Sequence, residues 1–149
     1  MDRRKPGSKH LLVVDGGGTP LAVELTAANV NEVTRLVPLV DAIPPVRGKV
    51  GAPLAKPKLV MADRGYDSDD NRIALSGKGI ATRIARRNTA HGSGLGVFRY
   101  VVEQTIALFH QFRRLRVRYE RRDDTHEAFM SLGCAMICWR RLHRPTGYL

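Results

Sequence analysis

The chain has 149 residues, of which 43% are hydrophobic and 26% are charged. This length is enough for one compact domain with its own core, but not for two. No apolar run approaches the roughly 18 residues that cross a bilayer, and no apolar segment of the signal-peptide type follows the basic N-terminus. The composition therefore excludes a membrane-spanning protein and favours a single cytosolic domain over residues 1–149.

The charge of the chain is strongly positive and unevenly distributed. Twenty-five Lys and Arg residues oppose 14 Asp and Glu residues, which gives a formal net charge of +11. From Arg83 to Arg122 there are ten Arg and only two acids, Glu103 and Glu120. A domain this basic repels itself, and nucleic acid is the commonest polyanion that would relieve the repulsion. The Arg-rich stretch is the expected contact with phosphate, and the alternative is a solvated basic surface.

The first half of the chain predicts a β-hairpin, then a helix and a long loop. Two short apolar runs, His10–Asp15 and Leu21–Thr26, flank a Gly-rich turn, which is typical of two antiparallel strands. Helical spacing of apolar residues follows over Asn31–Ile43, with a kink expected at Pro38. The stretch 44–57 is rich in Pro, Gly and Lys and indicates an exposed loop.

The second half predicts two strands and three helices. A short continuous apolar run indicates a strand buried on both faces, and the helix after it is capped by Asp67 or Ser68 and ends at Gly77 and Gly79. A long amphipathic helix and a final helix with a capping-box-like start follow. These segments are strands at Lys58–Asp63 and Ile80–Ala85, a loop at Asn88–Gly96, and helices at Val97–Arg116 and Asp124–Leu142.

This order of elements indicates an α/β domain with a mixed sheet. Cys134 and Cys138 lie on successive turns of the last helix, where disulfides rarely form, and no histidine pair nearby completes a zinc site. Both are therefore expected to be small buried hydrophobic residues. The same helix has an apolar face that is expected to lie in the core, made of Phe129, Leu132, Met136 and Trp139.

Two acids are candidate site residues. Asp63 ends a predicted strand, and in open α/β sheets sites gather at the carboxyl ends of strands. Glu103 falls in the polar stripe of the long helix. Each has a simpler alternative, namely an Asp63 that is bonded to turn amides and an exposed Arg99–Glu103 pair one helical turn apart. Asp15, by contrast, is expected to be a residue of the hairpin turn.

Considered together, the two acids suggest a different chemistry. A strand-end Asp and a helix-borne Glu in a domain that binds polyanions are typical of a two-metal phosphoryl-transfer site. Such a site needs hard oxygen ligands for Mg²⁺, and its two ions lie about 3.5–4 Å apart. Asp63 and Glu103 would then be metal ligands rather than proton shuttles.

At this point the sequence resembles insertion-sequence transposases of the DDE class, in the IS-four/IS-five group, over about residues 2–142. The Asp-x-Gly-Tyr-Asp-Ser and Arg-x-x-x-Glu motifs are the most specific part of the resemblance. Gly96 and His110 depart from the family pattern, which has Tyr at the first position and often Lys or another polar residue at the second. The segments that carry the resemblance are Lys5–Lys9, Asp41–Gly48, Ala62–Ser68, Arg99–Thr105 and Phe112–Glu120.

The resemblance implies a ribonuclease-H-like mixed sheet with flanking helices. It also implies three acids that use Mg²⁺ or Mn²⁺ to cleave transposon ends and join them to target DNA. Asp63 matches the second acid, Glu103 the third, and Arg99 the Arg four residues before it. The family's first Asp lies upstream of the region matching Met1. The chain is therefore expected to be a truncated or frameshift-encoded C-terminal part of the catalytic domain, lacking the first strand and inactive alone.

Several arginines are expected to contact DNA phosphates. The alternative function is an inactive DNA-binding remnant, or a modulator of the full transposase. Partners implied by the resemblance are DNA, the upstream-frame polypeptide or a second copy of the chain, and the location is the cytoplasm at the nucleoid. The arginines expected to bind DNA are Arg86, Arg87, Arg99, Arg113, Arg114 and Arg116.

Overall fold

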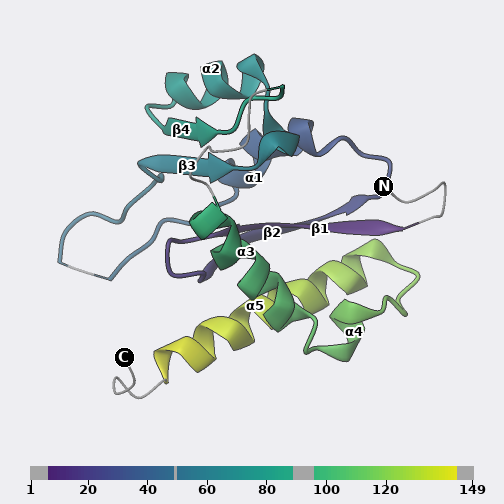
Figure 1. The fold of residues 1–149 in the computed structure, drawn as a ribbon. Coiled ribbons are helices and arrows are strands. Elements are labelled where there is room, and N and C mark those ends of the chain that lie inside the picture. Colours follow the sequence, from purple (N-terminus) through teal and green to yellow (C-terminus); the bar gives the residue numbers. More distant parts are fainter. Residues whose placement is uncertain (1–6, 49, 89–95, 144–149) are drawn as a thin grey trace. The chain divides into compact units, whose positions relative to one another are not determined.

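The computed structural model describes residues 7–48, 50–88 and 96–143, with the side chains of 96–98 excepted. The chain forms two compact units, and Figure 1 labels their elements. Unit 1 comprises residues 1–28 and 101–149, and unit 2 comprises residues 29–100. The loop predicted at Asn88–Gly96, including His91, lies largely outside the described residues.

Unit 1 begins with the predicted hairpin. Strand β1 (Ser8–Val14) pairs antiparallel with β2 (Pro20–Ala27), and the register is irregular between Val13 and Val14. Asp15 is the turn residue that the sequence predicted, because its Oδ1 accepts hydrogen bonds from the N–H groups of Gly17 (2.9 Å) and Thr19 (2.7 Å). The hairpin prediction is therefore confirmed.

The long helix predicted at Val97–Arg116 is two helices. Helix α3 (Gly96–Phe109) ends before a break, and α4 (Arg113–Arg116) begins after Phe112, whose backbone is extended. Phe109 and Leu115 both belong to the buried cluster of unit 1. Six residues apart on one helix they would point about 120° away from each other, so the break lets both side chains reach the same core.

Helix α5 (Asp123–Leu142) packs on β2, but not with the face that we expected. Its buried residues are His126, Met130, Gly133 and Ile137, and Phe129 is half-buried against the same cluster. A Cβ at Gly133 would meet Leu115 Cδ1 at 2.8 Å and Phe109 Cε1 at 3.1 Å. Close approach at this glycine selects the buried face, and the predicted core residues Leu132 (58%), Met136 (38%) and Trp139 (59%) are exposed.

The start of α5 and its cysteines also differ from expectation. The N-cap is Arg122, which makes no side-chain cap, so the predicted capping box is wrong. The carboxylate of Asp124 instead accepts from the Arg122 guanidinium and from the Thr125 N–H. Cys134 and Cys138 are free and only half-buried, and burial raises the pKa of the Cys134 thiol to about 11.

Unit 2 contains a parallel strand pair and short helices. Strand β3 (Leu59–Ala62) pairs in parallel with β4 (Ala81–Ile84). Helix α2 (Asp69–Gly77) lies between the two strands in sequence, with Asp69 and Asp70 in its first turn. The remaining elements are two 3₁₀ turns, η1 (Glu32–Arg35) and η2 (Arg64–Tyr66), and helix α1 (Leu36–Asp41).

Three local expectations in unit 2 need correction. The helix predicted at Asn31–Ile43 is η1 followed by α1, with Pro38 in the first turn of α1, where its missing N–H costs no helical hydrogen bond. Strand β3 is not buried on both faces, since Leu59 is 44% exposed and its other residues are half-buried. Ser68 is the N-cap of α2 but makes no side-chain cap.

The α/β class predicted from the sequence is confirmed. Among the described residues, the strands form one two-stranded sheet in each unit, antiparallel in unit 1 and parallel in unit 2. Within the described parts of the chain, no helix is long and apolar enough to cross a membrane.

Candidate active site

The candidate site in unit 2 lies at the carboxyl edge of the parallel strands. Asp63 directly follows β3, and Ala85, Arg86 and Arg87 directly follow β4. Parallel strands end at the same edge of a sheet, and α/β proteins place ligands there. The local topology therefore puts Asp63 where the sequence analysis predicted a functional carboxylate.

One oxygen of the Asp63 carboxylate is held and the side chain is exposed. Asp63 is the N-cap of η2, and its Oδ1 accepts a 2.8 Å hydrogen bond from the N–H of Gly65. Among the described residues, no hydrogen bond or ion pair reaches Oδ2. The simpler alternative, an Asp that only caps a turn, accounts for one oxygen and leaves the second open to a cation.

Charged side chains tie this turn to the end of β4. The carboxylate of Asp67 accepts from the Arg72 guanidinium at 2.5 Å and from the backbone N–H of Arg87 at 2.7 Å. These two hydrogen bonds, from Arg87 first and then Arg72, hold the pKa of Asp67 below its usual value. The Arg87 guanidinium donates in turn to the carbonyls of Arg64 (3.3 Å) and Gly65 (3.2 Å).

Two further side chains support the turn from within unit 2. The amide of buried Asn71 donates to the carbonyls of Val33 (2.9 Å) and Tyr66 (3.2 Å). Tyr66 packs against the core cluster, and burial, with help from Glu32 and Asp63, raises the pKa of its phenol to about 12. Asp67, Arg72 and Asn71 were not predicted as site residues, because only their spatial partners reveal what they do.

Glu103 lies on the exposed side of α3 in unit 1. Two residues further on, fully buried Thr105 donates from its hydroxyl to the Gly18 carbonyl at 2.8 Å, with the Val101 carbonyl at 3.1 Å. Positions two apart on a helix differ by about 200°, so the docked Thr105 turns Glu103 away from the hairpin. Asp63 and Glu103 belong to different units, and their predicted proximity stays a prediction.

The residues present suit a divalent cation chemically. Asp63 offers an exposed carboxylate oxygen, which is the hard ligand that Mg²⁺ prefers. In the described part of the chain, no group of three or more His, Cys, Asp or Glu side chains is arranged to hold a metal ion. A metal ion at Asp63 would therefore need ligands beyond such a group of described side chains.

Comparisons with known proteins show the family to which the chain belongs. A family model described as transposase DDE domain matches residues 2–139. The chain belongs to this transposase family. It is 61% identical over 143 residues to a putative transposase for insertion sequence element IS402 from Burkholderia cepacia, covering 96% of this chain and 68% of the relative. It is 31% identical over 126 residues to a transposase for IS1106 from Neisseria meningitidis serogroup B, covering 77% and 40%. No solved structure matches.

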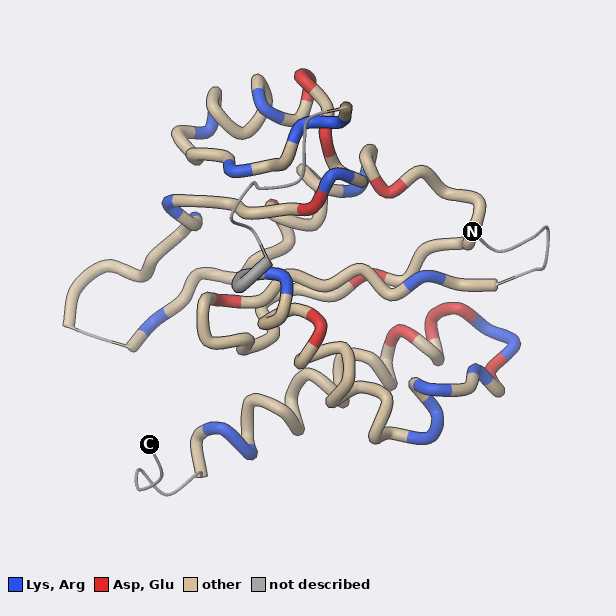
Figure 2. The backbone as a smooth tube through the Cα atoms, in the orientation of Figure 1, with Lys and Arg blue, Asp and Glu red and all other residues tan. Residues whose placement is uncertain are grey.

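In this insertion-sequence transposase, the segment from α4 to the start of α5 carries basic and acidic residues interleaved (Figure 2). Its three acids each pair with one arginine. Glu120 binds Arg114 at 2.5 Å, Asp123 binds Arg118, and Asp124 binds Arg122. In the described residues, the other three arginines of the segment make no ion pair, and these are Arg113, Arg116 and Arg121.

This division changes the expected phosphate contacts. Arg113 and Arg116, both predicted, are exposed, and Arg113 lies 5.6 Å from the centre of the Tyr119 ring. Arg121 was not predicted, although it is equally exposed. Arg114 already has two partners, since its guanidinium also lies 5.2 Å from the Phe129 ring. Its predicted role in DNA binding remains untested.

The sequence analysis missed a hydrogen-bonded row of side chains that includes Glu120, the partner of Arg114. Fully buried His126 lies 2.9 Å from His10 through the two Nε2 atoms, and its Nδ1 lies 3.2 Å from Glu120 Oε2. Arg114 first, and then His126, lower the pKa of Glu120 to about 2. The signal was available, because His126 shares the helical face of Met130, Gly133 and Ile137.

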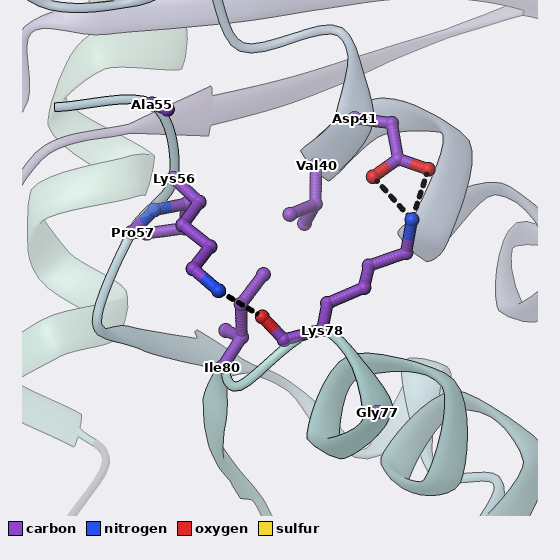
Figure 3. A pocket seen from close by; sticks show the side chains of 8 residues that line it. All are labelled: Val40, Asp41, Ala55, Lys56, Pro57, Gly77, Lys78 and Ile80. Atoms are coloured by element: carbon purple, nitrogen blue, oxygen red, sulfur yellow. Dashed lines mark hydrogen bonds and ion pairs between the residues drawn. The ribbon is translucent and has the colours of Figure 1, made fainter. Parts of the chain in front are cut away.

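Unit 2 also has a cavity of about 420 Å³ (Figure 3). It lies against Pro57 and Ile80, which precede β3 and β4, so it is at the amino edge of the strands. Its two lysines already have partners. Lys78 pairs with Asp41 at 3.0 Å, and Lys56 donates to the Lys78 carbonyl beyond the end of α2. The cavity is at the opposite strand ends from Asp63, and both of its lysines are engaged by groups of unit 2.

Proposed function

We propose that Asp63 and Glu103 are two of the three carboxylates with which this transposase binds Mg²⁺, or Mn²⁺, to cleave transposon ends and join them to target DNA. The observation that carries the proposal is the exposed Asp63 carboxylate at the carboxyl edge of a parallel strand pair, with one oxygen anchored by Gly65. The match to the DDE transposase family and the Asp-x-Gly-Tyr-Asp-Ser motif support the same assignment.

Each residue has a defined part in this chemistry. Bound divalent ions would lower the pKa of an attacking water or hydroxyl and stabilise the leaving oxygen. The Gly65 N–H fixes the orientation of the Asp63 carboxylate, so that its second oxygen presents lone pairs in one direction. Glu103 contributes its carboxylate as a metal ligand, from the face of α3 that the docked Thr105 turns away from the hairpin. For both carboxylates to serve one two-ion cluster, they must lie within about 4–8 Å of each other.

The fold and the DNA contacts are part of the proposal. We infer that the fold is of the ribonuclease-H-like type, with a mixed sheet and flanking helices, as the family match suggests. Arg86, Arg99, Arg113 and Arg116 are proposed to contact phosphates, with Arg121 added because it is exposed. Because chromosomal DNA would be the substrate, we expect the protein to act at the nucleoid. We propose that its protein partner is a second copy of the chain or an upstream polypeptide.

We further propose that a polypeptide of these 149 residues binds DNA without cleaving it. The family uses three acids, and only Asp63 and Glu103 match them here. Two carboxylates hold two divalent ions too loosely for the roughly ångström-level positioning that in-line attack requires. The alternative function, a DNA-binding modulator of the full transposase, makes the same prediction for this polypeptide but not for a longer version.

The experiment compares the 149-residue chain with a version that adds the upstream segment carrying the family's first Asp. Strand cleavage is measured on labelled transposon-end DNA in Mg²⁺. We expect cleavage only by the longer protein, and its loss by orders of magnitude in Asp63→Ala and Glu103→Ala. Matched controls are Asp70→Asn and Glu127→Gln, two exposed acids outside the site, which should cleave normally. Normal cleavage by Asp63→Ala would refute the assignment.

A further inference from the structure

We propose that Arg87 is a positioning residue that acts on Asp63 through a single peptide group, with Asp67 holding Arg87 in place. The sequence analysis expected both Arg86 and Arg87 to contact phosphates. The structure gives the two neighbours different surroundings. The inference rests on the proposed role of Asp63 as a metal ligand and assigns a new function to the residues around it.

The central observation is a hydrogen-bond relay. The carbonyl of Arg64 and the N–H of Gly65 belong to the same peptide group. Arg87 Nε donates to that carbonyl at 3.3 Å, while that N–H donates to Asp63 Oδ1 at 2.8 Å. Hydrogen bonds in series polarise one another, so the guanidinium makes the Gly65 N–H a stronger donor to the carboxylate.

A second bond fixes the orientation of the relay. Arg87 Nη2 donates to the Gly65 carbonyl at 3.2 Å, so one planar guanidinium grips two successive carbonyls of η2. The planar, forked guanidinium of arginine suits this two-carbonyl contact. A lysine ammonium has no such planar fork and cannot reproduce the contact. The peptide that orients Asp63 is therefore held from the end of the neighbouring strand.

Asp67 places Arg87 in this position. Its Oδ2 accepts the Arg87 backbone N–H at 2.7 Å, and its Oδ1 accepts Arg72 Nη2 at 2.5 Å. Arg72 Nη2 also donates to the carbonyl of Ile84, the last residue of β4, at 3.1 Å. Asp67 thereby clamps the end of β4 to the turn after β3, and it explains the second Asp of the motif that contains Asp63.

Arg86 makes a different set of contacts. Its side chain is 65% exposed and lies 3.7 Å from Asp69, a separation at which the pair is weak. A DNA phosphate could bind the Arg87 guanidinium only if it released two carbonyls of the turn, whereas the exposed Arg86 side chain is proposed to contact phosphate. The matched pair Arg86→Ala and Arg87→Ala separates phosphate binding from positioning.

Gly65 provides an independent way to move the same carboxylate. A Cβ at this position would lie 2.9 Å from Asp63 Oδ1, which is closer than such contacts allow. The atom that must yield is the end of a side chain, so Gly65→Ala should leave the fold intact and displace the carboxylate. This variant keeps the proposal testable if Arg87→Ala were to disturb folding.

The experiment uses the 149-residue chain and two readouts that need no catalysis. Mn²⁺ binding is titrated by electron paramagnetic resonance, and DNA affinity is measured in chelator over a range of salt concentrations. We expect Arg87→Ala and Gly65→Ala to raise the half-saturating Mn²⁺ concentration about 10–100-fold, as supporting residues of metal ligands do. Arg87→Lys should fall between Arg87→Ala and the parent. The salt dependence of DNA binding should not change in any of them.

Arg86→Ala should show the reverse pattern. Its Mn²⁺ affinity should stay at the parent value, while the slope of log K against log salt becomes shallower by about 0.9, the value for one phosphate contact. The proposal is overturned if Arg87→Ala shifts that slope as Arg86→Ala does, or if Mn²⁺ affinity is unchanged in Arg87→Ala and Gly65→Ala. Unchanged Mn²⁺ affinity in Asp63→Ala would instead refute the proposed function, so the two failures are distinguishable.

Discussion

The two units each contain a cluster of acids and arginines, and the clusters use them differently. In unit 1, both oxygens of Glu120 have partners, Arg114 and buried His126, and its pKa is about 2. In unit 2, both oxygens of Asp67 have partners as well, Arg72 and Arg87. Asp63, four residues before Asp67, has one oxygen held by a backbone N–H.

Glu120 and Asp67 both use their carboxylates to join elements of their own unit. Glu120 links α4 to α5, and Asp67 links the turn after β3 to the end of β4, so a cation could enter at either carboxylate only by displacing a partner. Asp63 is oriented by its own turn and keeps an oxygen for a ligand. If this comparison holds, substitutions in the unit 1 cluster change mainly stability, and substitutions at the carboxyl edge of unit 2 change mainly ligand binding.

The largest expected effect concerns the cores beneath the two clusters. Met130 in unit 1 and Leu75 in unit 2 are almost fully buried, and we expect alanine at either position to lower the free energy of unfolding by about 2–5 kcal/mol. Chemical denaturation gives the size of the loss, and hydrogen exchange should locate each loss in the unit of the substituted residue. Equal loss of protection across both units from either change would contradict the division into two cores.

A smaller loss is expected at Gly133, where α5 approaches the side chains of Leu115 and Phe109. Gly133→Ala places a Cβ 2.8 Å from Leu115 Cδ1, and overpacking of this kind costs about 1–3 kcal/mol. The control is Ala128→Gly on the exposed side of the same helix, which changes helix propensity only. If Gly133→Ala were more stable than the parent, the face of α5 that carries Gly133 would not be the face packed against Leu115 and Phe109 in solution.

The arginines of the α4–α5 segment allow a matched test of DNA binding. Replacing Arg113, Arg116 and Arg121 by Ala should make the slope of log K against log salt shallower by about 2–3. Replacing Arg114, Arg118 and Arg122, which are paired with acids, should lower thermal stability and change this slope less. Equal changes of slope in the two triple variants would show that pairing does not decide which arginines reach phosphate.

The smallest effect is the pH dependence of unit 1. Burial first, and then His126, His110 and Arg118, lower the pKa of His10, so the folded protein binds the His10 proton less tightly than the unfolded chain. As pH falls below about 6.5, the unfolded chain takes up this proton first and stability declines. His10→Gln should flatten the fall in melting temperature between about pH 7 and pH 5. An unchanged dependence of the melting temperature on pH would show that His10 does not cause this decline.

Glu120 adds a second decline at lower pH. Its folded pKa lies near 2 and its ordinary value is 4.5, so its contribution to stability is present above pH 4.5 and is lost as pH falls toward 2. Glu120→Gln should lower stability at neutral pH and remove this acid-range decline. His10→Gln and Glu120→Gln therefore probe the same group of hydrogen-bonded side chains in separate pH ranges.

Local patterns in the sequence were sufficient for several features. The hairpin and its Asp15 turn depend on residues close in sequence, and the strand–helix–strand order of unit 2 follows from short apolar runs and glycines. Asp63 was correctly placed at a strand end for the same reason. Its proposed role as a metal ligand depends on the family resemblance.

Features that depend on tertiary packing were not predictable. Helix α5 has two apolar faces, and the larger side chains suggested the wrong one, because close packing at Gly133 decides which face is buried. The break between α3 and α4 allows Phe109 and Leu115 to pack in the same core. The different surroundings of Arg86 and Arg87 depend on turn carbonyls more than 20 residues earlier in the chain.

Crystals grown with transposon-end DNA and Mn²⁺ would show whether Asp63 and Glu103 bind one metal cluster. We expect anomalous difference peaks with a carboxylate oxygen of each residue within about 2.5 Å of manganese, and the two carboxylates within about 4–8 Å of each other. Manganese bound by Asp67 or Asp15 instead, or by Asp63 with Glu103 on a distant surface, would contradict this expectation.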